Sequence, residues 1–301
     1  MPRRLVVALI AALAAGAVWA QSAAPQGPAE VVQVWRWQEA GAAFGGFSGI
    51  ELDAAGRGLV VLSDRGTIWR GQIARDAAEA ITGIEITAGP TALHTSTGAP
   101  AEGETGDSEG LALAPDATAI ISFEGVARVS RFTSDGGPAK LLPRPQEFAR
   151  MQLNSALEAL AIAEDGTLHT LPERLGDKAR AFPVYRLKPG AAQWDQPFAI
   201  PRDGDWLPVG ADFGPDGRLY LLERDFWGLL GFLSRVRVFD VAGETISGGA
   251  VVMQSRAGRF DNLEGIAAWR DASGAIRLTL ISDDNFNPLQ QTQLVELRLA
   301  P

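Results

Sequence analysis

Short apolar runs alternate with turn signals along most of the chain. In one stretch, an apolar run at 111–114 is followed by a Pro-Asp pair and a second apolar run at 119–123. This pattern is typical of a β-hairpin. Glu109 opens the first predicted strand and Glu124 closes the second. Because the start of one antiparallel strand lies beside the end of the next, we expect both carboxylates at one edge of the sheet.

The same hairpin recurs along the chain, and each copy is expected to close on a carboxylate. These closing residues are Asp64, Glu124, Glu173, Glu223 and Asp283. Their spacing of roughly 50 to 60 residues, built from strands, is the signature of a β-propeller. We predict an all-β fold with five blades of four antiparallel strands, and six blades as the alternative if 83–106 contains further strands. Val31–Trp37 is expected to complete the last blade from the other end of the chain.

The N-terminal 20 residues have the pattern of a secretory signal. Two arginines precede a short alanine-rich apolar run, and Val18-Trp-Ala20 offers small residues at the cleavage positions. An uncleaved anchor is the alternative. We therefore expect a signal peptide at 1–20, a linker at 21–30 and a propeller domain at 31–301. The mature protein is expected in the periplasm or secreted, without a stable membrane anchor.

Composition excludes several classes of function. The net charge of −9 and the pI of about 4.9 argue against nucleic acid and anionic membranes as partners. The absence of cysteine excludes disulfides, thiolate metal sites and a cysteine nucleophile. His94 and His169 form no metal pair, and no Gly-x-Ser-x-Gly elbow is present, which argues against a serine triad. With 46% hydrophobic residues the chain can bury its own core, and we expect a monomer.

The predicted hairpins gather carboxylates around the propeller axis. Such a ring of like charges is relieved by a hard cation, by arginines or by protonation. Ca²⁺ is the expected cation and Mg²⁺ the alternative, because the candidate ligands are oxygens. The ligand candidates are Glu109, Glu158, Glu264, Asp64, Asp283 and Asn285. The catalytic candidates are Glu124, Glu173 and Glu223 as bases, with Arg65, Arg174 and Arg224 to hold a phosphate or carboxylate group. Each arginine could equally be locked to a glutamate of a neighbouring blade.

Four sequence strings carry a resemblance to a known family. They are Leu62-Ser-Asp-Arg65, Leu222-Glu-Arg224, Asn262-Leu-Glu-Gly-Ile266 and Ser282-Asp-Asp-Asn-Phe286. They resemble the phytase-like family of secreted bacterial proteins, described by an esterase-like activity of phytase, over roughly residues 45–299. The resemblance implies a propeller and a metal-dependent hydrolase that acts on a small anionic ester or phosphoester. A non-catalytic propeller that binds a small ligand or a protein on its acidic rim is the alternative.

Overall fold

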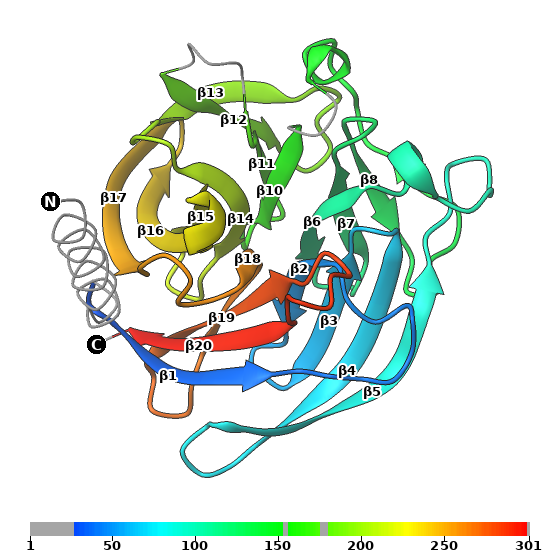
Figure 1. The fold of residues 1–301 in the computed structure, drawn as a ribbon. Coiled ribbons are helices and arrows are strands. Elements are labelled where there is room, and N and C mark those ends of the chain that lie inside the picture. Colours follow the sequence, from blue (N-terminus) through cyan, green and yellow to red (C-terminus); the bar gives the residue numbers. More distant parts are fainter. Residues whose placement is uncertain (1–26, 153–155, 175–179, 300–301) are drawn as a thin grey trace, which may run out of the picture.

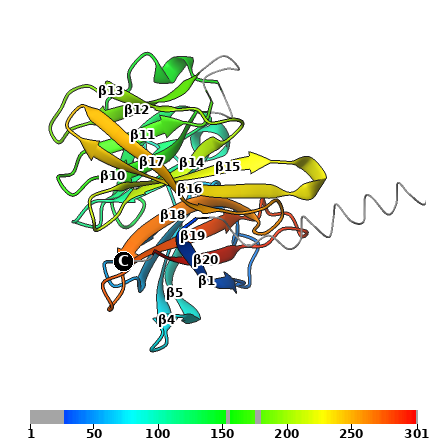
Figure 2. The same ribbon diagram turned by 90° about the vertical axis from the view of Figure 1, so that its left-hand side faces the viewer.

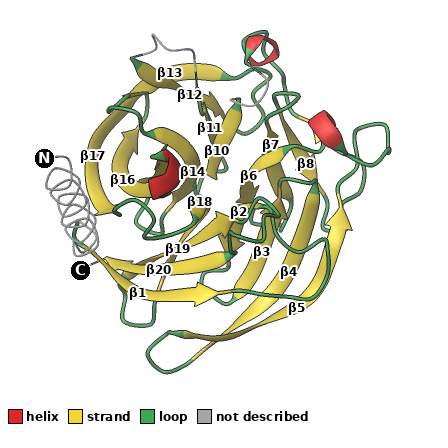
Figure 3. Cartoon of the chain, in the orientation of Figure 1, coloured by secondary structure: helices red, strands yellow, loops and turns green. Residues whose placement is uncertain are grey.

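The computed structural model describes residues 27–152, 156–174 and 180–299, and these form strands with three single turns of 3-10 helix (Figure 3). The strands make five antiparallel sheets of four strands each. The sheets are arranged around a common centre as the blades of a propeller (Figure 1). The predicted five blades are therefore confirmed. No helix within these residues is long and apolar enough to cross a membrane.

Each blade is numbered in chain order, and its innermost strand is given first. Blade 1 contains β2 (Phe47–Leu52), β3 (Gly58–Ser63), β4 (Thr67–Arg75) and β5 (Ile81–Ala92). Blade 2 contains β6 (Ser108–Leu113), β7 (Ala119–Phe123), β8 (Arg128–Phe132) and β9 (Lys140–Leu141). Blade 3 contains β10 (Leu157–Ile162), β11 (Leu168–Pro172), β12 (Ala181–Leu187) and β13 (Asp195–Pro201). Blade 4 contains β14 (Leu207–Phe213), β15 (Leu219–Phe226), β16 (Phe232–Ala242) and β17 (Thr245–Gln254). Blade 5 contains β18 (Asn262–Arg270), β19 (Ile276–Asp283), β20 (Gln293–Leu299) and β1 (Ala29–Arg36). The 3-10 turns are η1 (Gly103–Thr105), η2 (Phe148–Arg150) and η3 (Gly228–Leu230).

Both ends of the described chain close the ring in blade 5. β1 pairs antiparallel with β20, from Ala29 opposite Leu299 to Arg36 opposite Gln293. This confirms the predicted closure by Val31–Trp37. The signal segment at 1–20 and residues 21–26 of the linker lie outside the described residues, so those predictions stay predictions.

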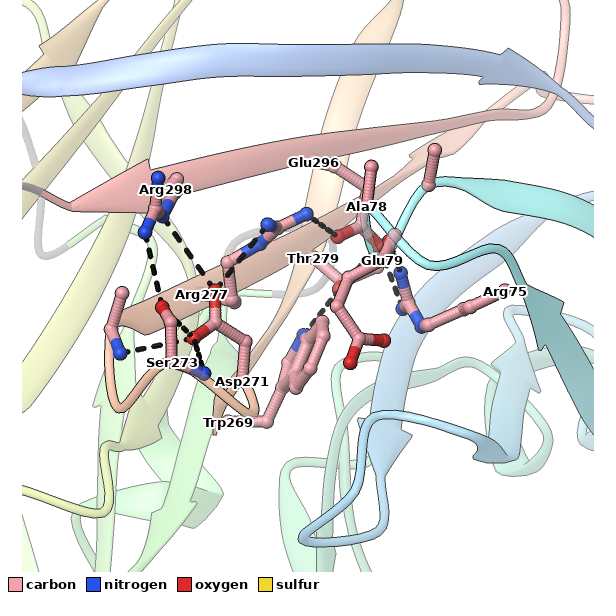
Figure 4. Close-up of polar contacts among 12 residues, drawn as sticks. Arg75, Ala78, Glu79, Trp269, Asp271, Ser273, Arg277, Thr279, Glu296 and Arg298 are labelled. Carbon is pink, nitrogen blue, oxygen red and sulfur yellow. Dashed lines mark hydrogen bonds and ion pairs between the residues drawn. The ribbon is translucent and has the colours of Figure 1, made fainter.

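A buried ionic network fastens blade 1 to blade 5 (Figure 4). Arg75 of β4 contacts Glu296 of β20 at 3.0 Å, and both side chains are fully buried. Thr279 donates a hydrogen bond of 2.8 Å to the same carboxylate, and Arg277 lies 3.4 Å from it. The carboxylate thus bridges cations from both blades. Removing one member of such a buried group leaves an unpaired charge, which costs about 3–5 kcal/mol.

The hydrophobic core is divided into five clusters, and each lies between two neighbouring blades. Between blades 5 and 1, for example, Phe47 and Ile50 pack with Ala267 and Ile281. Every interface of the ring is therefore filled with apolar side chains. The inner strands keep their order because both faces of each blade are buried.

Glycines let the inner strands approach one another at the centre. Gly49, Gly110, Gly210 and Gly265 occupy the same position in four blades, and the void left among the inner strands is only about 10 Å³. A Cβ on Gly110 would lie 2.5 Å from the backbone oxygen of Glu158 in the next blade. No side chain fits there. This close approach brings the residues immediately before these glycines together around the axis.

Candidate functional site

A pocket of about 800 Å³ opens where the inner strands begin and the second strands end. Its lining is strongly acidic, with a smaller number of arginines and a few apolar side chains. The lining residues are Asp64, Glu109, Glu124, Gln152, Glu158, Glu173, Arg174, Arg202, Asp205, Leu207, Arg224, Asp225, Phe226, Phe232, Asn262, Glu264, Asp283 and Asn285. We call this pocket the acidic mouth. Most of the residues that the sequence analysis singled out are brought together here.

Three glutamates from the inner strands form the deepest part of the acidic mouth. Glu109, Glu158 and Glu264 stand just before Gly110, Ala159 and Gly265, and each is buried. Burial raises the pKa of Glu109 and Glu158 well above the usual range, and neighbouring carboxylates raise it further. Burial also raises the pKa of Glu264, although Arg224 opposes the rise. The predicted convergence of these three positions is confirmed.

A second set of acidic residues follows the ends of the second strands. Burial raises the pKa of Asp64 to about 6, that of Glu124 to about 7 and that of Asp283 to about 8. Like charges add to each of these shifts. Glu173 also lines the pocket. The mouth therefore holds more carboxylate charge than its surroundings stabilise.

Two carboxylate triads have the spacing of a metal site. Oxygens of Asp107, Glu109 and Glu124 lie within 4.8 Å of one another, and so do those of Glu124, Glu158 and Glu173. Glu124 belongs to both triads, which places them side by side across blades 2 and 3. Sequence reasoning missed Asp107, although it stands two residues before Glu109 at the start of the repeat.

Glu109 differs from the other carboxylates of the acidic mouth because its carboxylate has no hydrogen-bond or ion-pair partner within the described part of the chain. The residue is 9% exposed, and among the residues that the structure describes no hydrogen bond or ion pair to its carboxylate is found. After burial itself, the largest effects on its pKa come from other carboxylates: Glu158, Glu264, Glu124 and Asp107. A buried charged group without a partner is costly. An all-oxygen donor set around such a group fits Ca²⁺ or Mg²⁺.

Blade 4 contributes a cation to the mouth where the other closing residues are acidic. Arg224 donates hydrogen bonds to Asn262 at 2.7 Å and to Glu173 at 3.0 Å, and it also contacts Glu264. Although burial acts against it, Glu264, Glu158 and Glu173 together raise the pKa of Arg224. Arg224 is therefore the built-in counter-ion of one side of the mouth. Asn262 supports it by donating to Glu264 at 2.8 Å.

The structure corrects the expected position of Glu223. This residue is fully buried away from the mouth, where its carboxylate accepts hydrogen bonds from Arg235 at 2.9 Å and from Arg237 at 2.7 and 2.5 Å. In the paired register, the closing residue comes two positions after the residue opposite the inner-strand glycine. Gly49 faces Leu62 and Asp64 follows, whereas Gly210 faces Leu222 and Arg224 follows. Alignment on the carboxylates alone had shifted blade 4 by one residue.

The other predicted residues divide between the mouth and its margin. Arg174 lines the mouth, contacts Glu173 at 3.3 Å and is 56% exposed at its side chain. Asn285 also lines the mouth, and its backbone N–H donates to Asp283 at 2.6 Å. Arg65 does not reach the mouth, because its guanidinium stacks 3.2 Å from the centre of the Phe286 ring.

Comparison with known proteins identifies one family and a set of distant folds. A family model described as "Phytase-like: Esterase-like activity of phytase" matches residues 42–286. No curated protein matches the chain. Several solved structures match most of the chain at 12–16% identity, with TM-scores below 0.5. One is an α-L-arabinofuranosidase from Podospora anserina, with 15% identity over 89% of this chain and 98% of that chain and a TM-score of 0.49. The second is an aldose sugar dehydrogenase from Streptomyces coelicolor, with 13% identity over 91% of this chain and 99% of that chain and a TM-score of 0.44. The third is a gluconolactonase from Xanthomonas campestris, with 16% identity over 84% of this chain and 72% of that chain and a TM-score of 0.44.

Proposed function

The chain belongs to the phytase-like family, and from that premise we propose that it is a metal-dependent hydrolase of phosphoester or ester bonds. The observation that carries the proposal is the pair of carboxylate triads that share Glu124. The unpartnered carboxylate of Glu109 in one of them supports it. We place the reaction at the acidic mouth.

We assign the residues of the acidic mouth to separate roles, beginning with those that would hold the cation. Asp107, Glu109 and Glu124 would hold the cation, because their oxygens form one triad and, within the described part of the chain, no arginine pairs with Glu109. Glu158, which shares the second triad with Glu124, stands beside them. Bound Ca²⁺ or Mg²⁺ supplies polarisation of a phosphoryl or carbonyl oxygen and lowers the pKa of a bound water. Asp64, Asp283 and Asn285 are the alternative ligands on the side of blades 1 and 5.

Arginines and a spare carboxylate complete the proposed site. Arg174 is exposed at the rim and can hold an anionic group of the substrate. Arg224 fixes Glu173 and Glu264 in place and keeps their charge balanced. Glu173, held at the mouth by both arginines, is the carboxylate that we assign to proton transfer from water.

Substrates and metals can be tested together. Phosphoester, ester and lactone substrates would be assayed with Ca²⁺, Mg²⁺, Mn²⁺ or EDTA. We expect turnover that EDTA abolishes, and a loss of at least about 100-fold in Glu109→Gln, which keeps the shape but removes a ligand charge. Glu51→Gln is the matched control, because Glu51 is equally buried but does not line the mouth.

Binding of the cation has its own readout. A ligand that binds only the folded state at 100 times its Kd stabilises it by about 2.7 kcal/mol, so millimolar Ca²⁺ should raise the melting temperature of the wild type but not of Glu109→Gln. If neither Ca²⁺ nor Mg²⁺ changes the melting curve and no substrate is turned over, the hydrolase proposal fails. The mouth would then be an arginine–carboxylate network beneath a binding surface. Export with cleavage before Gln21 and a monomeric state stay predictions, to be checked by mass spectrometry and by sedimentation.

A further inference from the structure

The β15–β16 hairpin of blade 4 continues past the rim of the acidic mouth. β15 runs through the closing residue Arg224 to Phe226, and its pairing with β16 extends to Phe226 opposite Phe232. In blades 1 to 3 the second strand ends before its closing residue. Figure 2 shows this hairpin projecting beyond the body of the ring. We call residues 225–232 the arm.

The arm is apolar and exposed. Side chains that would ordinarily be buried stand in solvent, with exposed fractions of 59% for Phe226, 55% for Trp227, 107% for Leu229 and 64% for Leu230. No charged residue lies between 226 and 232. A contiguous exposed apolar surface on a folded protein marks a place of interaction.

The conformation of the arm is fixed by its own hydrogen bonds. The Asp225 carboxylate accepts from the Phe226 N–H and from the Trp227 indole N–H, both at 2.8 Å. The Trp227 N–H donates to Gly231 O at 3.0 Å, and the Gly258 N–H donates to Phe232 O at 2.9 Å. The arm is a paired hairpin closed by η3. A preformed surface loses little entropy when it binds.

The arm and the acidic mouth share one cavity. Phe226 and Phe232 line the mouth together with Leu207, and the two rings pack with centroids 4.8 Å apart. Arg224, at the root of the arm, reaches the carboxylates Glu173 and Glu264. A molecule seated among the carboxylates would therefore extend along an apolar wall. Trp206 takes no part in this wall, because it packs against Arg235.

We propose that the acidic mouth takes an amphiphilic ligand, whose polar end lies among the carboxylates and whose alkyl or aryl group lies against the arm. The reacting ester or phosphoester group rests on the proposed function, whereas the apolar part of the ligand rests on the arm alone. A fully hydrophilic polyphosphate would leave the arm unused. The arm thus assigns the substrate to esters that carry an apolar group.

Alkyltrimethylammonium ions with chains from ethyl to octyl test this without any reaction. Their cationic head needs no metal to enter the acidic mouth, so binding is measured by titration calorimetry in EDTA. Each CH₂ that leaves water against the arm should tighten Kd by about two- to fourfold. The double variant Phe226→Ser with Trp227→Ser should remove most of this chain-length dependence. Leu289→Ser, which changes a 90% exposed leucine outside the arm, should keep it.

Each outcome decides the inference. No binding, a Kd that does not change with chain length, or the same dependence in the arm variant would overturn it. Melting curves of the variants show that they are folded, and Leu230→Ser gives a second, milder change in the arm. If the chain-length dependence holds but no ester is hydrolysed in the metal-dependent assay, the proposed function fails and the amphiphilic site stands.

Discussion

Replacement of Glu223 by alanine tests whether this residue is buried inside blade 4 or faces the acidic mouth. Glu223 is fully buried between Arg235 and Arg237, and it makes three hydrogen bonds with their guanidinium groups. Asp203 contacts Arg235 at 2.5 Å, but it is exposed and cannot replace the buried partner. Glu223→Ala would leave Arg237 without its carboxylate in the interior of blade 4. We therefore expect a structural effect and no effect on cation binding at the mouth.

The expected loss of stability in Glu223→Ala follows from the burial of its ion pairs with Arg235 and Arg237. Removing one partner of a buried ion pair costs about 3–5 kcal/mol. In a domain of this size, each kcal/mol lowers the melting temperature by about 2–4 °C, so Glu223→Ala should melt roughly 10 °C below the wild type. Urea unfolding measures the free energy, and Arg237→Met combined with Glu223→Ala should recover part of the loss, because the orphaned cation is gone.

The contrast with Glu109→Gln makes the test specific. Glu223→Ala should retain the Ca²⁺-dependent rise in melting temperature that Glu109→Gln loses. A variant that is as stable as the wild type but no longer responds to Ca²⁺ would refute this placement. Glu223 would then belong to the mouth, as the carboxylate repeat first indicated.

Two further predictions concern the fold around the axis. Gly110→Ala should destabilise the protein by at least about 2 kcal/mol in urea unfolding, because its Cβ would meet the Glu158 backbone oxygen; a neutral result would show that the inner strands can separate. Asp212→Asn should raise the melting temperature at pH 8 but hardly at pH 5. Burial raises the pKa of Asp212 to about 7 in the folded protein. Between about pH 4 and 7 the carboxyl group is therefore ionised in the unfolded state but still protonated in the folded state. The free energy of unfolding falls as the pH rises through this range, by on the order of a few kcal/mol in total. The amide keeps the hydrogen bond accepted from Ala268 N–H and removes the charge, and equal shifts at the two pH values would contradict this.

The blade count and the converging glutamates were accessible from the sequence because both depend on a period. Strand pairs recur at a regular spacing, and Glu109, Glu158 and Glu264 each precede a small residue at the same point of the repeat. Chain closure by Val31–Trp37 followed from counting strands. These inferences needed only the alternation of apolar and polar positions.

The register of blade 4 was not accessible in the same way. Leu222-Glu-Arg224 offers a carboxylate and a cation side by side, and only the pairing of Gly210 with Leu222 decides which one faces the mouth. A shift of one residue in a strand moves a side chain to the opposite face. The arm was missed for a related reason. Its glycine-rich apolar residues have the pattern of a loop, and only the pairing of Phe226 with Phe232 shows that they form a hairpin.

The position of Arg224 gives the acidic mouth two unequal sides. Glu264 and Glu173 share the guanidinium of Arg224 in blade 4, so part of the negative charge there is already offset within the protein. Glu109 lies in the triad with Asp107 and Glu124 at blade 2, where no arginine pairs with it among the described residues. An external cation is therefore favoured on that side, because carboxylates that lack a counter-ion gain most from one. The apolar arm rises from blade 4, the side that already has its cation. A ligand whose reacting group meets the metal at blades 2 and 3 would thus extend its apolar group toward the arm, and the two proposals place its two ends on different sides of one pocket.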